Sequence, residues 1–361
     1  MGNFKNISIN SFRNFESLSL KFSNNCNVFF GDNGSGKTNL LEAISLFSKG
    51  RGLKNEKLFN IIKRDKDKFI IKSDFENEGI IYKLVSETKI LNLQQRKILF
   101  VNNDKSIEIL NKIYSVAPFL FFLPETERLF VSSPSTRRNF IDRFIFSHKI
   151  AYNKVINQYN KNLTERSKLL KLSNFDNDWL NKIENNISIL GLEIYHSRKR
   201  QFESIVSYLN EFLKDFNQFY SINIKINDSF FIDEINQDYF ASMLKNNRKQ
   251  DAILGGSKIG PHKSDYLFEV NNEYTASQLS TGQQKTIILL LYLSQCKYLV
   301  DLGIKPILLL DEVCSHLDET NRKILLALVE TFDLQIFMTG TTKSLFSFLS
   351  TNTNFCNIVD L

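Results

Sequence analysis

The hydrophobic pattern of the first hundred residues predicts strands around one glycine-rich turn. Residues 18–22 alternate apolar and polar side chains, and the apolar run 28–30 ends at Gly31. Alternation with a period of two is typical of half-buried strands, so we expect two antiparallel strands and then a third that stops at the glycines. Apolar positions in 40–47 recur at helical spacing, and residues 69–101 alternate again. A helix and further antiparallel strands are therefore predicted.

Two long apolar stripes with helical spacing occupy the middle of the chain, one over 141–163 and one over 179–216. They contain little Gly or Pro, which predicts two long helices. Beyond 255–257, helical and strand patterns alternate again. The expected elements there are helices at 278–299 and 319–329 and strands at 307–310 and 335–338. This pattern indicates an α/β head with a mixed or parallel sheet and antiparallel strands, formed by residues 1–136 and 255–361, with a mostly helical arm inserted at 137–254.

Composition narrows the class of protein. The 361 residues are enough for about two folded units, and the net charge of +7 favours an anionic partner, nucleic acid before membrane. The longest apolar run, 287–293, is far shorter than the roughly 20 residues of a membrane span, and no secretory signal is visible. Four scattered cysteines suggest neither a zinc site nor a disulfide framework. We expect a soluble cytoplasmic protein.

The segment GDNGSGKT at 31–38 satisfies the phosphate-binding pattern GxxxxGK[ST]. Its glycines let backbone N–H groups converge on phosphate oxygens, Lys37 reaches the β and γ phosphates, and the Thr38 hydroxyl is placed for Mg²⁺. An ordinary glycine turn is the alternative, but a strand before the segment and a helix after it favour the phosphate loop. The candidate nucleotide-binding residues are Gly31, Asn33, Gly34, Ser35, Gly36, Lys37, Thr38 and Asn39.

A buried strand at 307–310 delivers two adjacent carboxylates to its carboxyl end, where ligands bind in open α/β sheets. Asp311 is placed to support Mg²⁺, and Glu312 to act as the general base on the attacking water. Alone, this segment could be a simple strand-to-loop transition. Together with the phosphate loop it predicts a Walker B element.

A third motif, LSTGQ, opens the helix expected at 278–299, and its residues are Leu279, Ser280, Thr281, Gly282 and Gln283. Ser280 at a helix N-terminus offers a hydroxyl and N–H groups to a phosphate, although an N-cap alone would do the same. The order of phosphate loop, LSTGQ, Walker B and then a D-loop ending at Asp318 is that of ABC-type ATPases. In that class the signature serves the nucleotide of the opposite subunit, so a homodimer that sandwiches two ATP molecules is expected.

The spacing of the motifs limits the insertion. About 240 residues separate Lys37 from Ser280, more than in a transporter subunit but far fewer than the coiled coils of chromosome-organising ATPases require. The spacing therefore predicts an inserted arm of moderate length. The sequence in fact resembles the RecF family, the bacterial recombination-mediator ATPases, over almost its whole length. The segments that carry this resemblance are FRNF at 12–15, GDNGSGKTNLLEAISLF at 31–47, PSTRRNFID at 134–142 and GPHKSD at 260–265.

The resemblance implies ATP and Mg²⁺ as cofactors, ATP-driven dimerisation, slow hydrolysis, and binding at junctions of single- and double-stranded DNA. It also implies RecO and RecR as partners in loading the strand-exchange recombinase, and no membrane partner. Three departures stand out. Thr339–Thr341 replaces the switch histidine of transporter-like ATPases, residues 119–122 offer no Q-loop glutamine, and 132–134 lack the glycines usual in the family. These gaps are compatible with slow hydrolysis.

Basic residues concentrate at the start of the arm. Between Arg137 and Lys171 there are nine basic and two acidic residues, a stripe that would bind duplex phosphates without sequence preference. A solvated helix face is the alternative, as is DNA binding on the head. The candidate DNA contacts are Arg137, Arg138, Lys154 and Lys161 in the arm and Arg51 and Lys54 in the head.

The motifs predict an ATP-gated DNA clamp, and two other functions are the alternatives to it. In a pure scaffold, nucleotide would only lock the dimer, and the intact Glu312 argues against that function. An ATPase with an attached nuclease, as in the overcoming-lysogenization-defect family, needs a further acidic metal-binding domain. Only about fifty residues follow the Walker B segment, too few for such a domain.

Overall fold

The computed structural model of the chain describes residues 2–54, 56–91, 94–172, 176–231, 235–315, 317–349 and 353–358. Two compact units result: Met1–Arg128 with Thr281–Leu361, here called the head, and Leu129–Ser280, here called the arm. This arm extends beyond the 137–254 expected from sequence at both ends. Phe130 and Phe268, which lie outside the expected limits, pack their rings against each other with centroids 5.0 Å apart.

The head contains an antiparallel sheet in which neighbours in sequence are mostly neighbours in space. Its strands run in the order β3-β2-β5-β6-β7, with β1 paired to β5. Their bounds are β1 Gly2–Phe4, β2 Asn6–Phe12, β3 Phe15–Lys21, β5 Ile70–Asn77, β6 Ile80–Leu91 and β7 Gln94–Val101. The strands expected from alternation at 18–22 and 69–101 are confirmed, since one face of this sheet is buried and the other is largely solvated.

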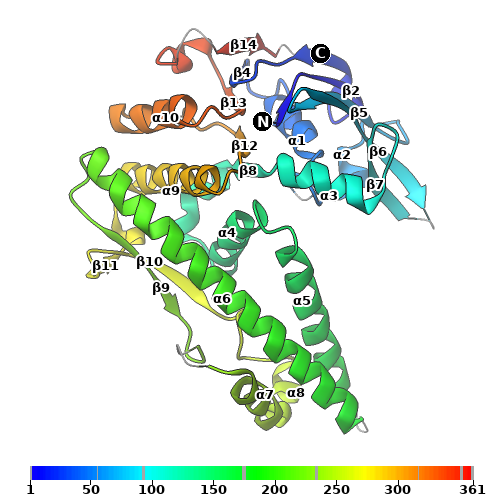
Figure 1. Cartoon of the computed structure of the whole chain (residues 1–361), viewed down its shortest axis with the longest axis vertical. Coiled ribbons are helices and arrows are strands. Elements are labelled where there is room, and N and C mark those ends of the chain that lie inside the picture. The colour runs from blue at the N-terminus through cyan, green and yellow to red at the C-terminus, as the bar shows by residue number, and fades with distance from the viewer. Residues whose placement is uncertain are drawn as a thin grey trace. The chain divides into compact units, whose positions relative to one another are not determined.

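The second sheet of the head is parallel and joins both ends of the chain (Figure 1). Its order is β14-β4-β13-β12-β8. The strands are β4 Cys26–Phe30, β8 Phe119–Phe122, β12 Ile307–Leu310, β13 Ile336–Gly340 and β14 Asn354–Asn357. Because both faces of β12 and β13 are covered, both strands are fully buried, and β12 is continuously apolar. Segments about 300 residues apart in sequence thus form one sheet, as the sequence predicted.

Helices cover both faces of the parallel sheet. On one face, α1 (Lys37–Ser45) shares a core with Phe29, Leu309 and Phe337, and this core continues into the antiparallel sheet. On the other face, α9 (Thr281–Asp301) places the Tyr292 ring 5.4 Å from that of Phe122, and α10 (Glu319–Thr331) packs against α9. The smaller helices of the head are α2 Leu58–Ile61, α3 Ile107–Val116 and η3 Lys343–Phe346, and η1 (Pro124–Val131) spans the boundary of the two units.

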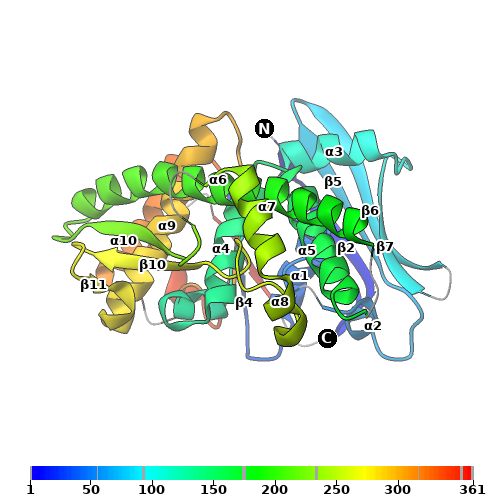
Figure 2. The same ribbon diagram turned by 90° about the horizontal axis from the view of Figure 1, so that it is seen from below.

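The arm contains helices and a small antiparallel sheet. Its elements are α4 Pro134–Phe146, α5 Tyr152–Leu169, α6 Asn177–Asp215, β9 Ile222–Asn227, α7 Gln237–Asn246, α8 Arg248–Leu254, β10 Asp265–Val270, β11 Tyr274–Thr275 and η2 Ala276–Gln278. The 39-residue helix α6 confirms the long helix predicted from the second apolar stripe, and Figure 2 shows this helix beside α5. The sheet, in the order β11-β10-β9, was not foreseen. No helix in the described ranges has the length and apolar character of a membrane span.

The first stripe is two helices rather than one. Helix α4 ends before Ser147, whose hydroxyl donates to the Phe144 carbonyl, and α5 begins only at Tyr152. Tyr152 then donates to the carboxylate of Asp142 at 2.8 Å. This buried hydrogen bond requires the chain to turn back, so tertiary contacts override an apolar period that continues through the break.

Candidate nucleotide-binding site

The glycine loop between β4 and α1 is held from outside by the turn that joins β2 and β3. Gly36 has φ 98°, and a Cβ there would lie 2.5 Å from the Asn14 side chain, so only glycine fits. Asn14 Nδ2 donates to the Ser35 carbonyl at 3.3 Å, and Asn39 Nδ2 donates to Asn14 Oδ1 at 2.9 Å. The loop is therefore shaped before any ligand enters.

Two side chains of this loop lack the partner that a phosphate would supply. Lys37 is 5% exposed, and among the described residues its ammonium donates to the carbonyls of Gly31 and Asp32 alone, at 2.9 and 2.7 Å. No carboxylate among the described residues pairs with it. The Ser35 hydroxyl is buried without any hydrogen-bond partner. Because a buried unsatisfied group and an uncompensated charge are both costly, anionic oxygens fit this loop.

The Walker B carboxylate reaches this loop directly. Thr38 Oγ1 lies 3.0 Å from each carboxylate oxygen of Asp311, which is 4% exposed and directly follows β12. A hydroxyl and a carboxylate are ligands that Mg²⁺ prefers, and the ion commonly completes its shell with phosphate oxygens and water. No group of three or more His, Cys, Asp or Glu side chains in the described part of the chain could hold a metal by itself. The donor set fits Mg²⁺ that is bound together with a nucleotide, as a charge-neutralising ion.

Glu312 follows Asp311 in a left-handed conformation, with φ 51°. Its backbone N–H donates to Thr339 Oγ1 at 2.9 Å, and the same hydroxyl donates to Asp311 Oδ1 at 2.7 Å. The side chain of Glu312 is exposed, and within the described ranges no ion pair holds its carboxylate. A carboxylate that is exposed beside a phosphate site is able to accept a proton from water.

The signature residues lie at the start of α9. The helix begins at Thr281, so the sequence-predicted helix is confirmed and Ser280 precedes it. From Ser280 to Gln283 these residues are exposed, while Leu279 is half-buried. They stand on the sheet face opposite to that covered by α1.

Two side chains of α9 connect this helix to the D-loop. Lys285 Nζ donates to the Ser315 carbonyl and lies 2.7 Å from Glu127 Oε1, and Thr286 Oγ1 donates to Asn321. Asp318 caps α10 by accepting the Asn321 N–H at 2.7 Å. His316 of the D-loop lies outside the described residues. The signature and the segment after Walker B are thus joined in one hydrogen-bonded unit.

The candidate DNA contacts divide into exposed and internal side chains. Arg51 and Lys54 are exposed after α1, and Lys154 and Lys161 are exposed on α5. Arg138 is half-buried and donates to the Ser264 carbonyl.

Arg137 does not fit the DNA-contact prediction. It is 8% exposed and makes a bidentate pair with Asp265, with both N···O distances 2.8 Å. Arg166, which was counted in the basic stripe, is 1% exposed and also paired. The surface charge of the stripe is therefore lower than the sequence count.

Sequence reasoning missed the residues that support the loop. Arg13 makes a bidentate pair with the buried Glu42 of α1, and Phe12 and Phe15 on either side are fully buried. From sequence, this motif carries the family resemblance, and Arg13 is a candidate DNA contact on the head rather than a support of α1. In the sequence, Thr339 stands out only because it lies where other ATPases have the switch histidine. Its place at the carboxyl end of a strand next to Walker B is nevertheless a signal of a role in the site, because ligands bind at that edge of an open α/β sheet.

Comparison with known proteins gives a consistent result. The model of the RecF/RecN/SMC N terminal domain matches residues 3–357. The DNA replication and repair protein RecF of Rickettsia akari (strain Hartford) is 32% identical over 339 residues, 93% of each chain. A solved structure described as the recombination mediator protein RecF-ATP in the RecFOR pathway is 28% identical, with a TM-score of 0.84 over 95% of this chain and 93% of that one. An SmcHead bound to the C-winged helix domain of ScpA, 16% identical, shares the fold with a TM-score of 0.56 over 96% of this chain and 92% of that one.

Proposed function

Because the chain belongs to the RecF family within the RecF/RecN/SMC class, we propose that it is an ATP-dependent DNA-binding protein of recombinational repair and replication. One observation carries the nucleotide part of this proposal. Thr38 of the glycine loop and Asp311 of β12 are far apart in sequence, yet their oxygens meet at 3.0 Å. This contact creates the place where a triphosphate and Mg²⁺ bind together.

Each residue of the site has a separate task in ATP turnover. Lys37 and the N–H groups at the start of α1 hold phosphate oxygens, and the Ser35 hydroxyl gains a partner. Thr38 and Asp311 hold Mg²⁺, which neutralises charge on the phosphates. Glu312 orients the attacking water and takes its proton. Hydrolysis is slow, since neither a switch histidine nor a Q-loop glutamine is present at the expected places, and membership of the family supports its dependence on DNA.

ATP closes two copies of the chain into a homodimer. The support for this step is that α1 and the start of α9 lie on opposite faces of the parallel sheet. The residues from Ser280 to Gln283 are exposed and belong to the ATP site of a second copy. The dimer then holds DNA at gaps where single and double strands meet, acts in the cytoplasm with RecO and RecR, and helps to load the strand-exchange recombinase.

Mobility shifts with gapped, single-stranded and duplex DNA, each with and without ATP, test this function directly. The expected result is ATP-dependent binding that is tightest on the gapped substrate, with a dimer in sedimentation. Binding that is equal with and without ATP on all three substrates would overturn the clamp mechanism.

The Glu312→Gln variant separates a clamp from a scaffold without turnover. An amide still hydrogen-bonds water but takes no proton, so long-lived ATP dimers with slow release from DNA are expected. A scaffold would give the same DNA lifetime for the variant and the original protein, because turnover would have no part in release.

A further inference from the structure

A hollow in the arm is lined by lysines, and none of its described lining residues is acidic. Its volume is about 480 Å³, and its walls are the last turns of α5 and the loop 255–263. Lys168 and Lys171 stand on the first wall and Lys258 and Lys263 on the second. All four side chains are exposed, and within the described ranges none of them is ion-paired. Four ammonium groups around one concave surface give a strong local positive potential.

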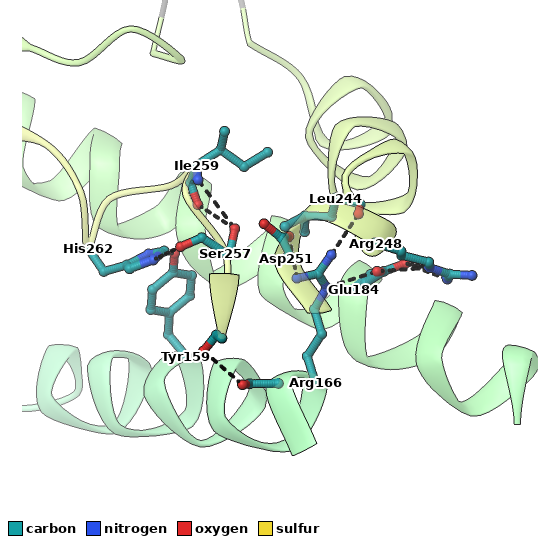
Figure 3. A network of polar contacts seen from close by, with 11 residues as sticks. Tyr159, Arg166, Glu184, Leu244, Arg248, Asp251, Ser257, Ile259 and His262 are labelled. Carbon is teal, nitrogen blue, oxygen red and sulfur yellow. Dashed lines mark hydrogen bonds and ion pairs between the residues drawn. The ribbon is translucent and has the colours of Figure 1, made fainter. Parts of the chain in front are cut away.

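The acidic residues behind this hollow are occupied by other cations. Arg166 of α5 pairs with Glu184 at 2.9 Å and with Asp251 at 2.7 Å, and it donates to the Leu244 carbonyl. Arg248 makes a second pair with Glu184. Figure 3 shows this network to the side of Ser257 and His262 of the loop. The two carboxylates are thus neutralised internally and do not compensate the lysines.

The loop that carries two of the lysines is rigidly held. His262 Nδ1 accepts a hydrogen bond from the Tyr159 hydroxyl at 2.8 Å, and Nε2 lies 3.0 Å from the Ser257 carbonyl (Figure 3). Gly260 has φ 116°, and a Cβ there would come within 2.5 Å of the Tyr159 hydroxyl, so the chain passes too close for any side chain. Ser167 Oγ of α5 donates to the Gly255 carbonyl at 3.1 Å. The two walls are therefore connected without a ligand.

The chemistry of the hollow favours phosphate over a base or an apolar group. The hydroxyls of Thr164 and Ser167 already donate to the carbonyls of Asn160 and Gly255, which leaves the ammonium groups as the side-chain donors. Among the described lining residues there is no Phe, Tyr or Trp, and the ring of His262 is held by hydrogen bonds at both nitrogens, so these residues offer no free platform on which a base could stack. Lysines bind phosphate as point charges, without reading sequence.

We propose that this hollow, defined by Lys168, Lys171, Lys258 and Lys263, is a phosphate site of the arm that is separate from the glycine loop of the head. It takes phosphate groups either from a nucleic-acid backbone or from a free polyphosphate. The proposal rests on the proposed function only if the phosphates come from a nucleic-acid backbone, in which case the hollow would be one of the places where DNA contacts the arm. An acidic protein segment is the competing occupant, and the test includes it.

The test removes two charges from one wall and compares them with two charges elsewhere in the arm. Lys258→Gln/Lys263→Gln changes the loop, and Lys168→Gln/Lys171→Gln changes the helix wall. The matched control is Lys182→Gln/Lys214→Gln, two exposed lysines of α6 with no ion pair among the described residues. Fluorescence anisotropy with a gapped duplex at several salt concentrations measures DNA binding. Each wall variant should weaken binding at least about tenfold at 0.1 M salt and flatten the salt slope by about 1.8, while the control changes little.

Calorimetry with inorganic tripolyphosphate distinguishes the sources, using Lys37→Met backgrounds so that the glycine loop does not contribute. Loss of tripolyphosphate binding in both wall variants, with DNA binding unchanged, would support the site with a free polyphosphate as its ligand. This result would support the site even if the original protein bound no DNA at all. Absence of DNA binding would contradict only the proposed function. Equal losses in the control, no loss in either wall variant, or better competition by poly-glutamate than by tripolyphosphate would overturn the proposal.

Discussion

At the scale of single residues, one hydroxyl organises the Walker B end of β12. Thr339 Oγ1 donates to Asp311 and accepts the N–H of Glu312, whose φ is 51°. Left-handed backbone is unfavourable for a residue with a side chain, so an outside contact must hold it. Thr339 is therefore a positioning residue for both carboxylates.

Thr339→Val should slow ATP turnover more than it weakens ATP binding. Thr339 is fully buried, so valine leaves the Glu312 N–H and an Asp311 oxygen without their partner, at a cost of about 1 to 3 kcal/mol. Steady-state turnover, nucleotide affinity and urea unfolding measure the three effects. Thr339→Ser keeps the hydroxyl and should restore turnover. A valine variant with unchanged turnover would show that this hydroxyl does not position Glu312.

His262 makes the stability of the arm depend on pH. Burial lowers its pKa from 6.5 to about 4, so the folded ring stays neutral while the unfolded ring is protonated below about 6.5. The unfolded state then binds more protons, and stability is lost as pH falls from about 6.5 toward 4. We expect a loss of about 2 kcal/mol by pH 5 that His262→Gln does not show. Urea unfolding of both proteins at pH 7 and pH 5 measures this loss. An equal loss of unfolding free energy in the two proteins would show that His262 is not its cause.

At the scale of elements, buried charge pairs connect α4 and α6 to the chain after Gly260. Arg198 of α6 pairs with Asp142 of α4 and donates to the Pro261 carbonyl, and Arg137 of α4 pairs with Asp265 of β10. The motifs 134–142 and 260–265 are therefore two halves of one structural contact. From sequence, Arg137 and Arg138 of the first motif are candidate DNA contacts, because a run of charges does not reveal which of its members is buried.

Arg137→Gln should destabilise the arm without changing DNA binding. It leaves Asp265, whose pKa is lowered mainly by the Arg137 contact against the opposing effect of burial, without its cation. Losing one member of such a pair costs about 2 to 4 kcal/mol. Urea unfolding measures this loss, and Lys225→Gln, which breaks an exposed pair with Glu269, should cost less than about 1 kcal/mol. If the variant instead had unchanged stability and a flatter slope of log K for DNA against log salt, Arg137 would be a DNA contact after all.

Helix α9 carries the other element-scale prediction. If Ser280 meets the nucleotide of a second copy, Ser280→Arg should block ATP-driven dimerisation through bulk and charge, with ATP affinity of the monomer nearly unchanged. Sedimentation and equilibrium binding measure the two effects. A mixture with Lys37→Met protein should regain one composite site, and therefore turnover that neither variant has alone. Weaker ATP binding by the Ser280→Arg monomer would instead place the signature in its own subunit's site.

For the whole molecule, the sequence could predict whatever depends on period and motif order. The continuous apolar run of β12 and the glycines before Lys37 are local patterns, and both elements lie where the sequence predicts them. The pairing of the arm sheet could not be predicted, since β9 and β10 pair across about 40 residues, although β9 itself alternates apolar and polar residues at every position. Nor could the break before Tyr152, whose cause is the buried hydrogen bond of Tyr152 with Asp142, a carboxylate that Arg198 of α6 also holds. Side chains that act through such contacts, such as Thr339, leave no local pattern.

The last prediction concerns which exposed charges of the whole molecule contact DNA. Lys154→Gln/Lys161→Gln removes two exposed charges from α5, and Arg51→Gln/Lys54→Gln removes two from the head beyond α1. Each lost phosphate contact should flatten the slope of log K against log salt by about 0.9. We expect the α5 pair to lower the slope by about 1.8 for all sequences alike, with ATP-driven dimerisation intact, because the glycine loop and signature lie outside α5. If the head pair alone flattens the slope, the DNA lies on the head. Unchanged slopes in both variants would exclude these two surfaces as the DNA contact.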